Sequence, residues 1–323
     1  MSRDEIITLL GSDWTAFEDI AGRKLHSGIA LLDSVNSSIW GNSGKKLRPM
    51  ISLLMAAALG RINTDSVHYA AACEILHNAT LLHDDVADNS ATRRGKPTLS
   101  ALMGPGSAVL VGDFWLSKAV DLVVGTRHQT DAIPVLSRTL SDLAEGEMLQ
   151  LEKAGTADTT EEDYLRIVFC KTASLFEASC RTAAISVDAG PEMLLAAGRY
   201  GVATGIAFQI RDDIFDYGTE SGIGKPVGSD LREGKITLPL LGALRNAPAE
   251  EARIRGMVAG IRENPSACEE IRSFVLANGG LEYASSRLDG FVAEALDALG
   301  AIPGSAYKSA LEGIARYNAV RTV

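Results

Sequence analysis

The sequence has no paired cysteines, few aromatic residues and no long hydrophobic run. Its four cysteines stand singly without a C-x-x-C pair, and its first residues contain no apolar signal segment. We therefore expect a reduced, cytoplasmic protein without a disulfide framework. The longest stretch without Asp, Glu, Lys or Arg covers residues 97–112 and is interrupted by glycine and proline. Since a membrane-spanning helix needs about 20 apolar residues, the sequence predicts no membrane span.

Positive charge is also scarce. The chain has 31 Lys and Arg residues against 41 Asp and Glu residues, which gives a formal net charge of -10. A general binder of nucleic acid or anionic membranes needs net or clustered basic charge, so the sequence predicts no nucleic-acid partner. Any ligand that carries phosphate must then be held by a local group of cations.

Aliphatic residues at helical spacing are the main feature of the sequence. Of the 323 residues, 46% are hydrophobic and only 6% are aromatic, which favours a large core of Ala, Leu and Ile. Apolar residues recur three and four positions apart, as between Val67 and Val86, and this spacing is typical of helices rather than strands. No Ser/Gly-rich or Pro-rich linker divides the chain. We therefore predict an all-α fold in which residues 1–323 form a single large helical domain.

The acidic motif D-D-x-x-D occurs twice, each time after an apolar helical stretch. On a helix its first and last aspartates lie on one face, where like charges repel unless a cation lies between them. Oxygen ligands without a nearby thiolate favour Mg²⁺, which binds one or two carboxylates and completes its shell with water and phosphate oxygens. A lone copy would fit a solvated acidic helix end, whereas two copies followed by cations indicate a metal and diphosphate site. The motif residues are Asp84, Asp85 and Asp88, then Asp212, Asp213 and Asp216.

Basic residues accompany both motifs. Lys45 and Arg48 lie at a predicted helix start, where a second anion can bind, although an ordinary basic helix start is the alternative. Lys171 stands in the otherwise apolar helix 167–178, and a buried lysine needs an anionic partner. The cations that follow the motifs are Arg93, Arg94 and Lys96 after the first, and Lys225, Arg232 and Lys235 after the second.

In their order and spacing, these residues resemble the trans-isoprenyl diphosphate synthases. The resemblance extends over residues 44–241 and lies nearest to the long-chain branch, close to the octaprenyl diphosphate synthases. The segment after residue 241 carries helical periodicity without a motif, and we assign it to packing. The matching motifs are Gly44-Lys45-Lys46-Leu47-Arg48-Pro49, Glu74-Ile75-Leu76-His77, the two acidic motifs, Arg93-Arg94-Gly95, Lys171-Thr172, Phe208-Gln209, Gly224-Lys225 and Gly234-Lys235.

The resemblance implies a bundle of helices around a deep central cavity, with the two acidic motifs at its mouth, and a homodimer. It also implies that Mg²⁺, as three ions when substrate is bound, is the cofactor. The implied metal ligands are Asp84, Asp88 and Asp212, with Asp85, Asp213 and Asp216 nearby or bonded through water. The implied contacts to the allylic diphosphate are Arg93, Lys171, Thr172, Gln209 and Lys235, with Lys225 close by. The implied contacts to isopentenyl diphosphate are Lys45, Arg48, His77 and Arg94.

The chemistry implied is ionisation, condensation and elimination. Cations around the allylic diphosphate neutralise the leaving group, and the alkene of isopentenyl diphosphate then attacks the allylic carbocation. Loss of a proton ends the step, so the aspartates act as ligands and no nucleophilic Ser or Cys is required. The residues expected to carry catalysis are Asp84, Asp88, Arg93, Lys171, Asp212 and Lys235.

Product length is set by what lies beneath the first motif. Ala79 and Thr80 are small and lie about one turn before Asp84, so they leave room for a growing chain, while Leu76, one turn deeper, is a candidate cap. We expect extension of farnesyl diphosphate to an all-trans octaprenyl diphosphate, the length of a quinone side chain. A shorter farnesyl or geranylgeranyl product, and a role as the catalytic subunit of a heteromeric synthase, stay open.

Two other classes of protein match the sequence less well. A ferritin-like di-iron bundle needs two E-x-x-H motifs, and only His77 of the five histidines has a glutamate three residues before it. A terpene cyclase shares the helical fold and one acidic motif, but such enzymes usually carry an N-S-E type triad in place of the second and lack the cations expected for isopentenyl diphosphate.

Overall fold

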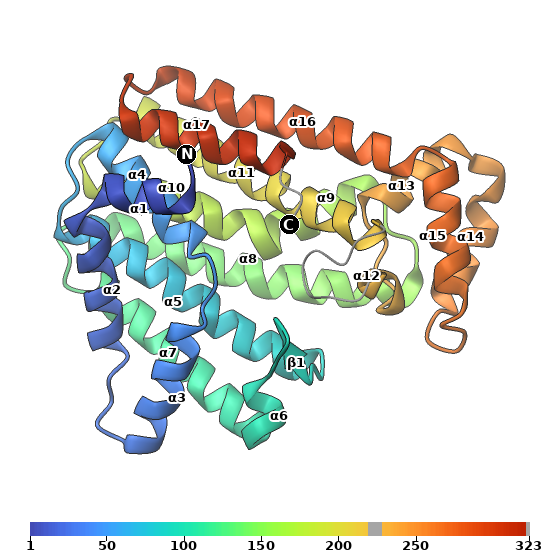
Figure 1. Cartoon of the computed structure of the whole chain (residues 1–323), viewed down its shortest axis with the longest axis horizontal. Helices are drawn as coiled ribbons and strands as arrows, with labels where there is room; N and C mark the ends of the chain where they lie inside the picture. The colour runs from blue at the N-terminus through green and yellow to red at the C-terminus, as the bar shows by residue number, and fades with distance from the viewer. Residues whose placement is uncertain (219–227, 321–323) are drawn as a thin grey trace. The chain divides into compact units, whose positions relative to one another are not determined.

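The structure is a computed structural model that describes residues 1–218 and 228–320, with only the backbone given for 319 and 320. The described residues form helices almost throughout, which confirms the all-α prediction, and one short hairpin (Figure 1). In chain order the elements are α1 (Arg3–Leu10), α2 (Ser12–Lys24), α3 (Ala30–Gly41), α4 (Leu47–Leu59), α5 (Thr64–Ala87), β1 (Thr92–Arg93), β2 (Lys96–Pro97), α6 (Leu99–Met103), α7 (Pro105–Val123), α8 (Gln129–Thr156), α9 (Glu161–Val168), η1 (Phe169–Ala173), α10 (Ser174–Ser186), α11 (Pro191–Tyr217), α12 (Ser229–Arg232), α13 (Leu238–Asn246), η2 (Pro248–Glu250), α14 (Glu251–Ala259), α15 (Ala267–Ala277), α16 (Gly280–Ala298), η3 (Leu299–Ala301) and α17 (Ala306–Val320).

The chain forms two compact units, each assembled from separate segments. The first unit comprises Met1–Arg138, Leu175–Gly201 and Ala298–Ile314. The second comprises Thr139–Ser174, Val202–Asp297 and the residues from Ala315 onward. Helices α8, α10, α11, α16 and α17 therefore have residues in both units, and no linker marks any of these crossings. This explains why the composition shows no break.

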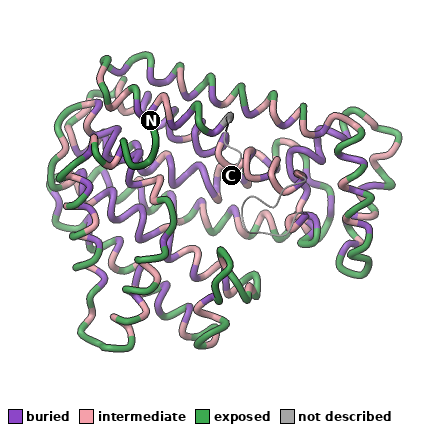
Figure 2. The backbone as a smooth tube through the Cα atoms, in the orientation of Figure 1, coloured by how far each residue is buried: buried purple, intermediate pink, exposed green. Residues whose placement is uncertain are grey.

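Helix α5 is the centre of the first unit. It packs against α2, α4 and α7, and most of its residues are buried, as the purple tube in Figure 2 shows for α4 and α5. Its N-terminus is fixed by a capping box in which Asn63 accepts a hydrogen bond from the Ser66 amide and Ser66 accepts one from the Asn63 amide. Nearby, the buried Trp115 indole donates a hydrogen bond to Asn36 at 2.7 Å. The helix is thus held along its length before it reaches the first acidic motif.

The second unit has its own aliphatic core. Ile210, Leu240, Ile254, Val275 and Leu288 are almost fully buried in one cluster drawn from α11, α13, α14, α15 and α16.

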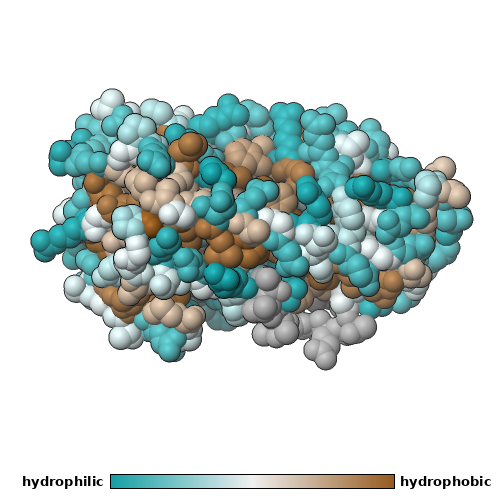
Figure 3. Space-filling view, turned by 90° about the horizontal axis from the view of Figure 1, so that it is seen from above, coloured by the Kyte–Doolittle hydropathy of each residue, from teal (hydrophilic) through white to brown (hydrophobic). Residues whose placement is uncertain are grey.

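On the face shown in Figure 3, hydrophobic residues gather in groups that polar residues separate. Among the described residues, no helix is both long and apolar enough to cross a membrane, which agrees with the sequence.

The four cysteines are all free thiols. Cys73, Cys170 and Cys180 are buried, whereas Cys268 on α15 is half-buried. Burial raises the pKa of Cys73 to about 11 and that of Cys180 well above its ordinary value. None of the four is paired, as the sequence predicts.

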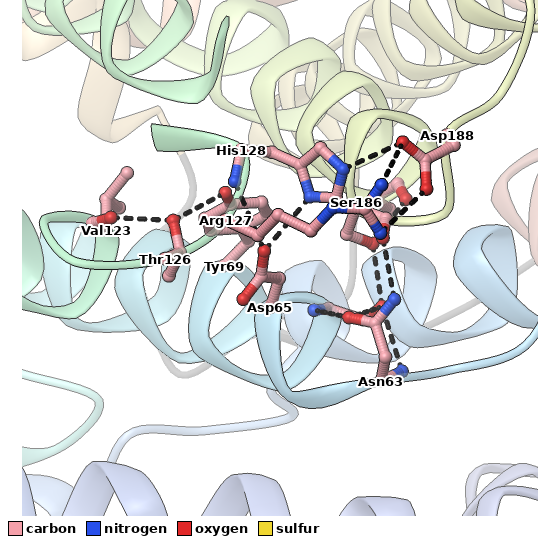
Figure 4. Close-up of polar contacts among 11 residues, drawn as sticks. Asn63, Asp65, Tyr69, Val123, Thr126, Arg127, His128, Ser186 and Asp188 are labelled. Atoms are coloured by element: carbon pink, nitrogen blue, oxygen red, sulfur yellow. Dashed lines mark hydrogen bonds and ion pairs between the residues drawn. The ribbon is translucent and has the colours of Figure 1, made fainter. Parts of the chain in front are cut away.

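A histidine clamp joins three segments of the first unit (Figure 4). The ring of His128, between α7 and α8, lies between two carboxylates, with Nδ1 3.0 Å from Asp65 and Nε2 2.9 Å from Asp188. Asn63 also donates to the Ser186 carbonyl at 2.6 Å, close to the same point. The start of α5 is thereby fixed to the segment before α8 and to the end of α10.

Candidate active site

The first acidic motif lies at the C-terminal end of α5. Asp84 belongs to the last turn, and Asp88 is the C-cap residue, whose amide donates to the Asp84 carbonyl at 2.8 Å. A helix C-terminus carries partial negative charge, so carboxylates there are unfavourable unless a cation is near. Asp84 is half-buried and Asp88 exposed. These are the properties of carboxylates that can reach a ligand.

Asp85 differs from its two neighbours. It is only 5% exposed, and its Oδ1 lies 2.7 Å from Nε of Arg93. Its carbonyl accepts a hydrogen bond from the Ser90 amide at 3.0 Å. Asp85 therefore fixes the segment that follows the motif, and one of its oxygens already has a cationic partner.

The cations after the first motif lie on a two-stranded hairpin that the sequence did not predict. Thr92 pairs with Pro97 and Arg93 with Lys96, and the central residues Arg94 and Gly95 both have positive φ, at 53° and 74°. Positive φ at both positions defines a type I′ hairpin turn, for which a glycine is the usual signal. The Arg94-Gly95 step was therefore the signal available in the sequence.

This hairpin brings Arg94 to the turn before α4. Its Nη1 donates to the Asn42 carbonyl at 3.3 Å, and a Cβ placed on Gly44 would lie 2.3 Å from the same nitrogen. Gly44 also has a φ of 86°, so its lack of a side chain serves both the turn and the close approach. Arg94 is thus placed beside the basic segment of Lys45 and Arg48, with which it was predicted to bind one anion.

Within that basic segment, the three cations have different roles. Lys46 forms an ion pair with Glu18 at 2.7 Å and lies 4.1 Å from the centre of the Trp40 ring. Lys45 is exposed, and Arg48 is half-buried with its guanidinium 4.7 Å from the Phe176 ring centre. Lys46 therefore stabilises the fold, whereas Lys45 and Arg48 lie at the start of α4, where backbone amides favour an anion.

His77 on α5 lies within the electrostatic influence of these arginines. Burial, followed by the charges of Arg48 and Arg94, holds the pKa of His77 well below its ordinary value. His77 is therefore neutral at physiological pH. One turn earlier, Glu74 is 1% exposed, and burial raises its pKa to about 7 against the opposing charges of Arg48 and Lys46. Glu74 supplies the nearby carboxylate that such a group of cations needs, a role the sequence did not reveal.

The predicted tunnel residues lie further back on α5. Leu76 and Ala79 are each 1% exposed. Thr80 is half-buried, and its hydroxyl donates to the His77 carbonyl at 2.8 Å. The Thr80 hydroxyl is therefore bonded to the backbone of its own helix.

The second acidic motif ends helix α11 in the second unit. Asp212 is half-buried. Asp216 instead accepts hydrogen bonds from the amides of Ser229 and Asp230, at 3.0 and 3.1 Å, and another from the Ser229 hydroxyl. These contacts satisfy the free amides at the start of α12. Asp216 therefore fixes the segment that leads to Lys235.

Asp213 lies inside the second unit and is 3% exposed. Its Oδ2 accepts a hydrogen bond from the Tyr164 hydroxyl at 2.6 Å, and its Oδ1 accepts one from Nε2 of Gln209 at 2.9 Å. Burial, aided by the charge of Asp230, raises the pKa of Asp213. Burial also raises the pKa of Tyr164 well above its ordinary value, so the phenol keeps its proton.

Lys171 and Thr172 lie on η1, a π-helical turn between α9 and α10. Such turns widen a helix locally and are frequent at functional sites. Lys171 is ion-paired with Glu147 on α8, the anionic partner that its apolar surroundings required. Thr172 donates to Oε1 of Gln209 at 2.9 Å, so the structure brings these two predicted residues together.

The remaining predicted cation of this unit is Lys235, which follows α12 and forms an ion pair with Glu233. Its amide donates to the Asp230 carbonyl at 2.9 Å, and Gly234 before it has a φ of 80°. Lys225 lies outside the described residues.

Within residues 1–218 and 228–320, no three His, Cys, Asp or Glu side chains converge to form a metal cage. The acidic motifs still fit Mg²⁺, because this ion takes only one or two carboxylates and leaves its other positions to water and phosphate. Their donor sets consist of carboxylate oxygens at the negative ends of two helices. The residues present therefore match a hard cation that binds together with a phosphate ligand.

Comparison with known proteins agrees with this chemistry. The family described as Polyprenyl synthetase matches residues 29–275. Octaprenyl diphosphate synthase of Escherichia coli (strain K12) is 36% identical over 316 residues, which cover 98% of each chain. The all-trans-nonaprenyl-diphosphate synthase (geranyl-diphosphate specific) of Rhodobacter capsulatus is 37% identical over 97% of this chain and 96% of its own.

A solved structure extends the match to the fold. The polyprenyl synthase of Caulobacter crescentus, determined with calcium and isoprenyl diphosphate, superposes with a TM-score of 0.91 at 33% identity, covering 100% of this chain and 98% of its own. The chain therefore belongs to the polyprenyl synthetase family and is a long-chain prenyltransferase with the helical fold of that family.

Proposed function

We propose that the chain adds isopentenyl diphosphate to farnesyl diphosphate, in the presence of Mg²⁺, until an all-trans octaprenyl diphosphate is formed. The observation that carries the proposal is the pair of acidic motifs, each at the C-terminal end of a long helix and each followed along the chain by its own cations. Both the 36% identical octaprenyl synthase and the 37% identical nonaprenyl synthase make long products, and this supports the product class.

We assign the metal to Asp84, Asp88 and Asp212. When bound, Mg²⁺ neutralises charge on the diphosphate leaving group. We place the other three motif aspartates, Asp85, Asp213 and Asp216, near the metal or bonded to it through water. Asp85 and Asp216 also keep the loops that carry Arg93 and Lys235 in place. Three Mg²⁺ ions with substrate bound remain our proposal. The calcium and isoprenyl diphosphate bound to the Caulobacter crescentus protein support a site for a divalent cation and a diphosphate.

The allylic diphosphate is proposed to bind Arg93, Lys171, Thr172, Gln209 and Lys235, with Lys225 close by. Arg93, Lys171 and Lys235 each have a carboxylate partner, which orients the cation and still leaves some of its N–H donors for a phosphate. Such preorganised donors stabilise the charge that develops on the departing diphosphate. Ionisation of the C–O bond then gives the allylic carbocation.

Isopentenyl diphosphate is proposed to bind Lys45, Arg48, His77 and Arg94. Arg94 is held against Gly44, and His77 stays neutral among the arginines, so it donates or accepts a hydrogen bond without adding charge. The alkene, held in place by its diphosphate, attacks the carbocation, since a fixed nucleophile replaces a bimolecular encounter. A proton is then lost to the departing diphosphate, and one isoprene unit has been added.

Chain length is proposed to depend on the face of α5 beneath Asp84. Ala79 and Thr80 are small there, and Leu76 is the candidate cap one turn deeper. An octaprenyl product follows if growth passes these positions. The single polyprenyl synthase domain over residues 1–323 likewise remains a proposal, supported by relatives that match along almost the whole chain.

We also propose a homodimer. Several large apolar side chains of the first unit are exposed on and near α7, which is unusual for a surface that faces only water. Leu110 is 71% exposed, Val124 54% and Val120 45%. Leu102 on α6 and Ile133 on α8 are also exposed, at 67% and 40%. A second copy of the chain is the occupant that we assign to the apolar face on α7.

The test is a product assay. Purified protein is incubated with Mg²⁺, farnesyl diphosphate and labelled isopentenyl diphosphate, and the dephosphorylated products are sized by chromatography. A ladder that ends near eight isoprene units is the expected result. A stop at three or four units would keep the reaction class and refute the proposed length. No incorporation beside an active control enzyme would indicate that a partner subunit is required or that the chain is a cyclase.

Single substitutions in the same assay test the assignment of the metal ligands. Asp84→Asn and Asp212→Asn should each lower kcat by about 10²- to 10³-fold, because each removes a charged group that holds the metal and so stabilises the leaving group. Asp289→Asn, which changes an exposed carboxylate on α16, is the matched control and should retain full activity. Equal activity in all three variants would refute the metal assignment.

A further inference from the structure

A chain of three hydrogen bonds crosses the interior of the second unit. It begins at Tyr164 on α9, whose hydroxyl donates to Asp213 at 2.6 Å. Gln209 donates to the other oxygen of Asp213 at 2.9 Å. Thr172 then donates to Gln209 at 2.9 Å. Two members of this chain, Gln209 and Thr172, are proposed contacts of the allylic diphosphate, and a third belongs to the acidic motif.

The donors fix the direction of each hydrogen bond. Nε2 of Gln209 donates to Asp213, so the amide oxygen of Gln209 faces Thr172. Thr172 donates its single hydroxyl proton to the amide oxygen of Gln209. One buried carboxylate therefore determines the orientation of two side chains that contact substrate.

Tyr164 stands at one end of this series of hydrogen bonds and belongs to none of the sequence motifs. It is 4% exposed, and its ring packs in the aliphatic core of the second unit with Val168 and Ile210. Helix α9 is fixed at its start by a capping box between Thr160 and Asp163. A phenol hydroxyl in such a core would be costly without a partner. Since both ring and hydroxyl are held, Tyr164 can hold Asp213 in one position.

We propose that Tyr164 is a positioning residue of the allylic site, which acts through Asp213 on Gln209 and Thr172. This inference rests on the proposed function and deepens it, since it gives a role to a residue that belongs to none of the sequence motifs. Tyr164 touches neither substrate nor the reacting atoms. Its effect is to hold the Gln209 amide from both ends, through Asp213 and Thr172, so that the amide N–H that Asp213 does not use is oriented for the diphosphate.

The experiment uses Tyr164→Phe, which removes only the hydroxyl. Loss of this hydrogen bond leaves a buried oxygen of Asp213 without its donor and should raise KM for farnesyl diphosphate by about 10-fold and lower kcat. The KM for isopentenyl diphosphate should change by less than about twofold, because its proposed contacts lie in the first unit. The affinity for the thio analogue of farnesyl diphosphate, which does not ionise, should fall by the same factor in calorimetry.

Tyr283→Phe is the matched control. The Tyr283 hydroxyl also donates to a carboxylate of the same unit, Glu161, at 2.5 Å, but none of its contacts includes a proposed substrate residue. Both variants should melt within a few degrees of the wild type, and only Tyr164→Phe should change the kinetics. In a double-mutant cycle, Tyr164→Phe should add little to Gln209→Ala, because both changes break the same chain.

A second variant tests the same chain if Tyr164→Phe does not fold. Asp213→Asn keeps the shape of the side chain and offers one acceptor in place of two. It should raise KM for farnesyl diphosphate and leave the Mg²⁺ concentration for half-maximal activity unchanged. A tenfold shift in that concentration would make Asp213 a metal ligand and overturn the inference.

Two further outcomes would overturn it. Unchanged kinetics of Tyr164→Phe in an enzyme whose wild type elongates would remove the positioning role and leave the proposed function intact. An equal rise in both KM values, with a lower melting temperature, would show a purely structural tyrosine. Inactivity of the wild type itself would instead refute the proposed function.

Discussion

The protonation of His128 illustrates how single residues set local stability. Burial alone would lower the pKa of His128, but the hydrogen bonds to Asp188 and Asp65 outweigh it and raise the pKa above the ordinary value. The folded chain therefore binds this proton more tightly than the unfolded chain. Its contribution to stability is fully present below the unfolded pKa, about 6.5, and is lost as the pH rises through the folded pKa.

We predict that His128→Asn destabilises the protein more at pH 5.5 than at pH 8.5. At pH 5.5 the substitution should lower the free energy of unfolding by about 0.5 kcal/mol. The effect is small because Asp188 is largely exposed and water screens the His128–Asp188 pair. Urea unfolding followed by circular dichroism at the two pH values measures it. His26→Asn, which changes a histidine that is 71% exposed, is the control. A larger loss at pH 8.5 than at pH 5.5 would contradict the assignment of the charge.

The six motif aspartates show what the sequence can and cannot reveal at this scale. The pattern identifies all six and their helix ends. It does not distinguish Asp213, which is enclosed by Tyr164 and Gln209, from Asp212 beside it, because the enclosing tyrosine comes from a helix 49 residues earlier. Asp216 likewise finds its partner, Ser229, 13 residues further along the chain, a pairing that helical periodicity does not predict.

At the scale of elements, close packing of α8 against η1 determines where Lys171 lies. A Cβ placed on Gly146 would lie 2.6 Å from Cβ of Cys170 and 2.9 Å from Cγ of Lys171. These distances are too short for any side chain, so the π-helical turn must move if Gly146 is replaced. The glycine therefore allows α8 to approach the turn that carries two proposed substrate contacts.

We predict that Gly146→Ala destabilises the protein by about 1–3 kcal/mol, the usual effect of overpacking. It should also raise KM for the allylic diphosphate several-fold, because Lys171 is displaced. Thermal melting and steady-state kinetics measure the two effects. Gly155→Ala on the same helix is the matched control, since nothing lies within 4 Å of the added Cβ. That change should leave the kinetics unaltered and stabilise the helix by up to about 1 kcal/mol. Similar behaviour of the two variants would contradict the packing argument.

Helical periodicity predicted the elements well and their irregularities poorly. The apolar stripe between Val67 and Val86 does lie on one long buried helix, α5. The hairpin around Arg94 was missed because two-residue strands have no detectable alternation. The π-helical turn at Phe169–Ala173 was missed because it inserts into a helix without changing its composition.

At the scale of the whole molecule, the exposed apolar face on α7 bears on assembly. We predict that the protein sediments at twice its chain mass of 34.2 kDa and that Leu110→Glu shifts it toward the monomer. Placing a charge within a buried apolar interface is costly, which is the physical reason. Leu195→Glu is the control, because Leu195 is similarly exposed, at 66%, on α11. Analytical ultracentrifugation measures the mass, and a monomeric wild type would contradict the dimer.

The division into two compact units was beyond sequence reasoning. A change of domain is usually recognised by a linker or a shift in composition. Here every crossing between the units falls within a helix, as in α8 near Arg138 and α11 near Gly201, so neither signal exists. Resemblance along the whole chain identifies the family without the need to place these boundaries.

The burial of the cysteines has a practical consequence for spectroscopy. Cys73, Cys170 and Cys180 are shielded from reagents, and only the half-buried Cys268 lies near the surface. A thiol-reactive fluorophore applied at low excess to the native enzyme therefore has a single accessible attachment point, on α15. The wild-type chain can in this way carry a reporter of the second unit without any engineered residue.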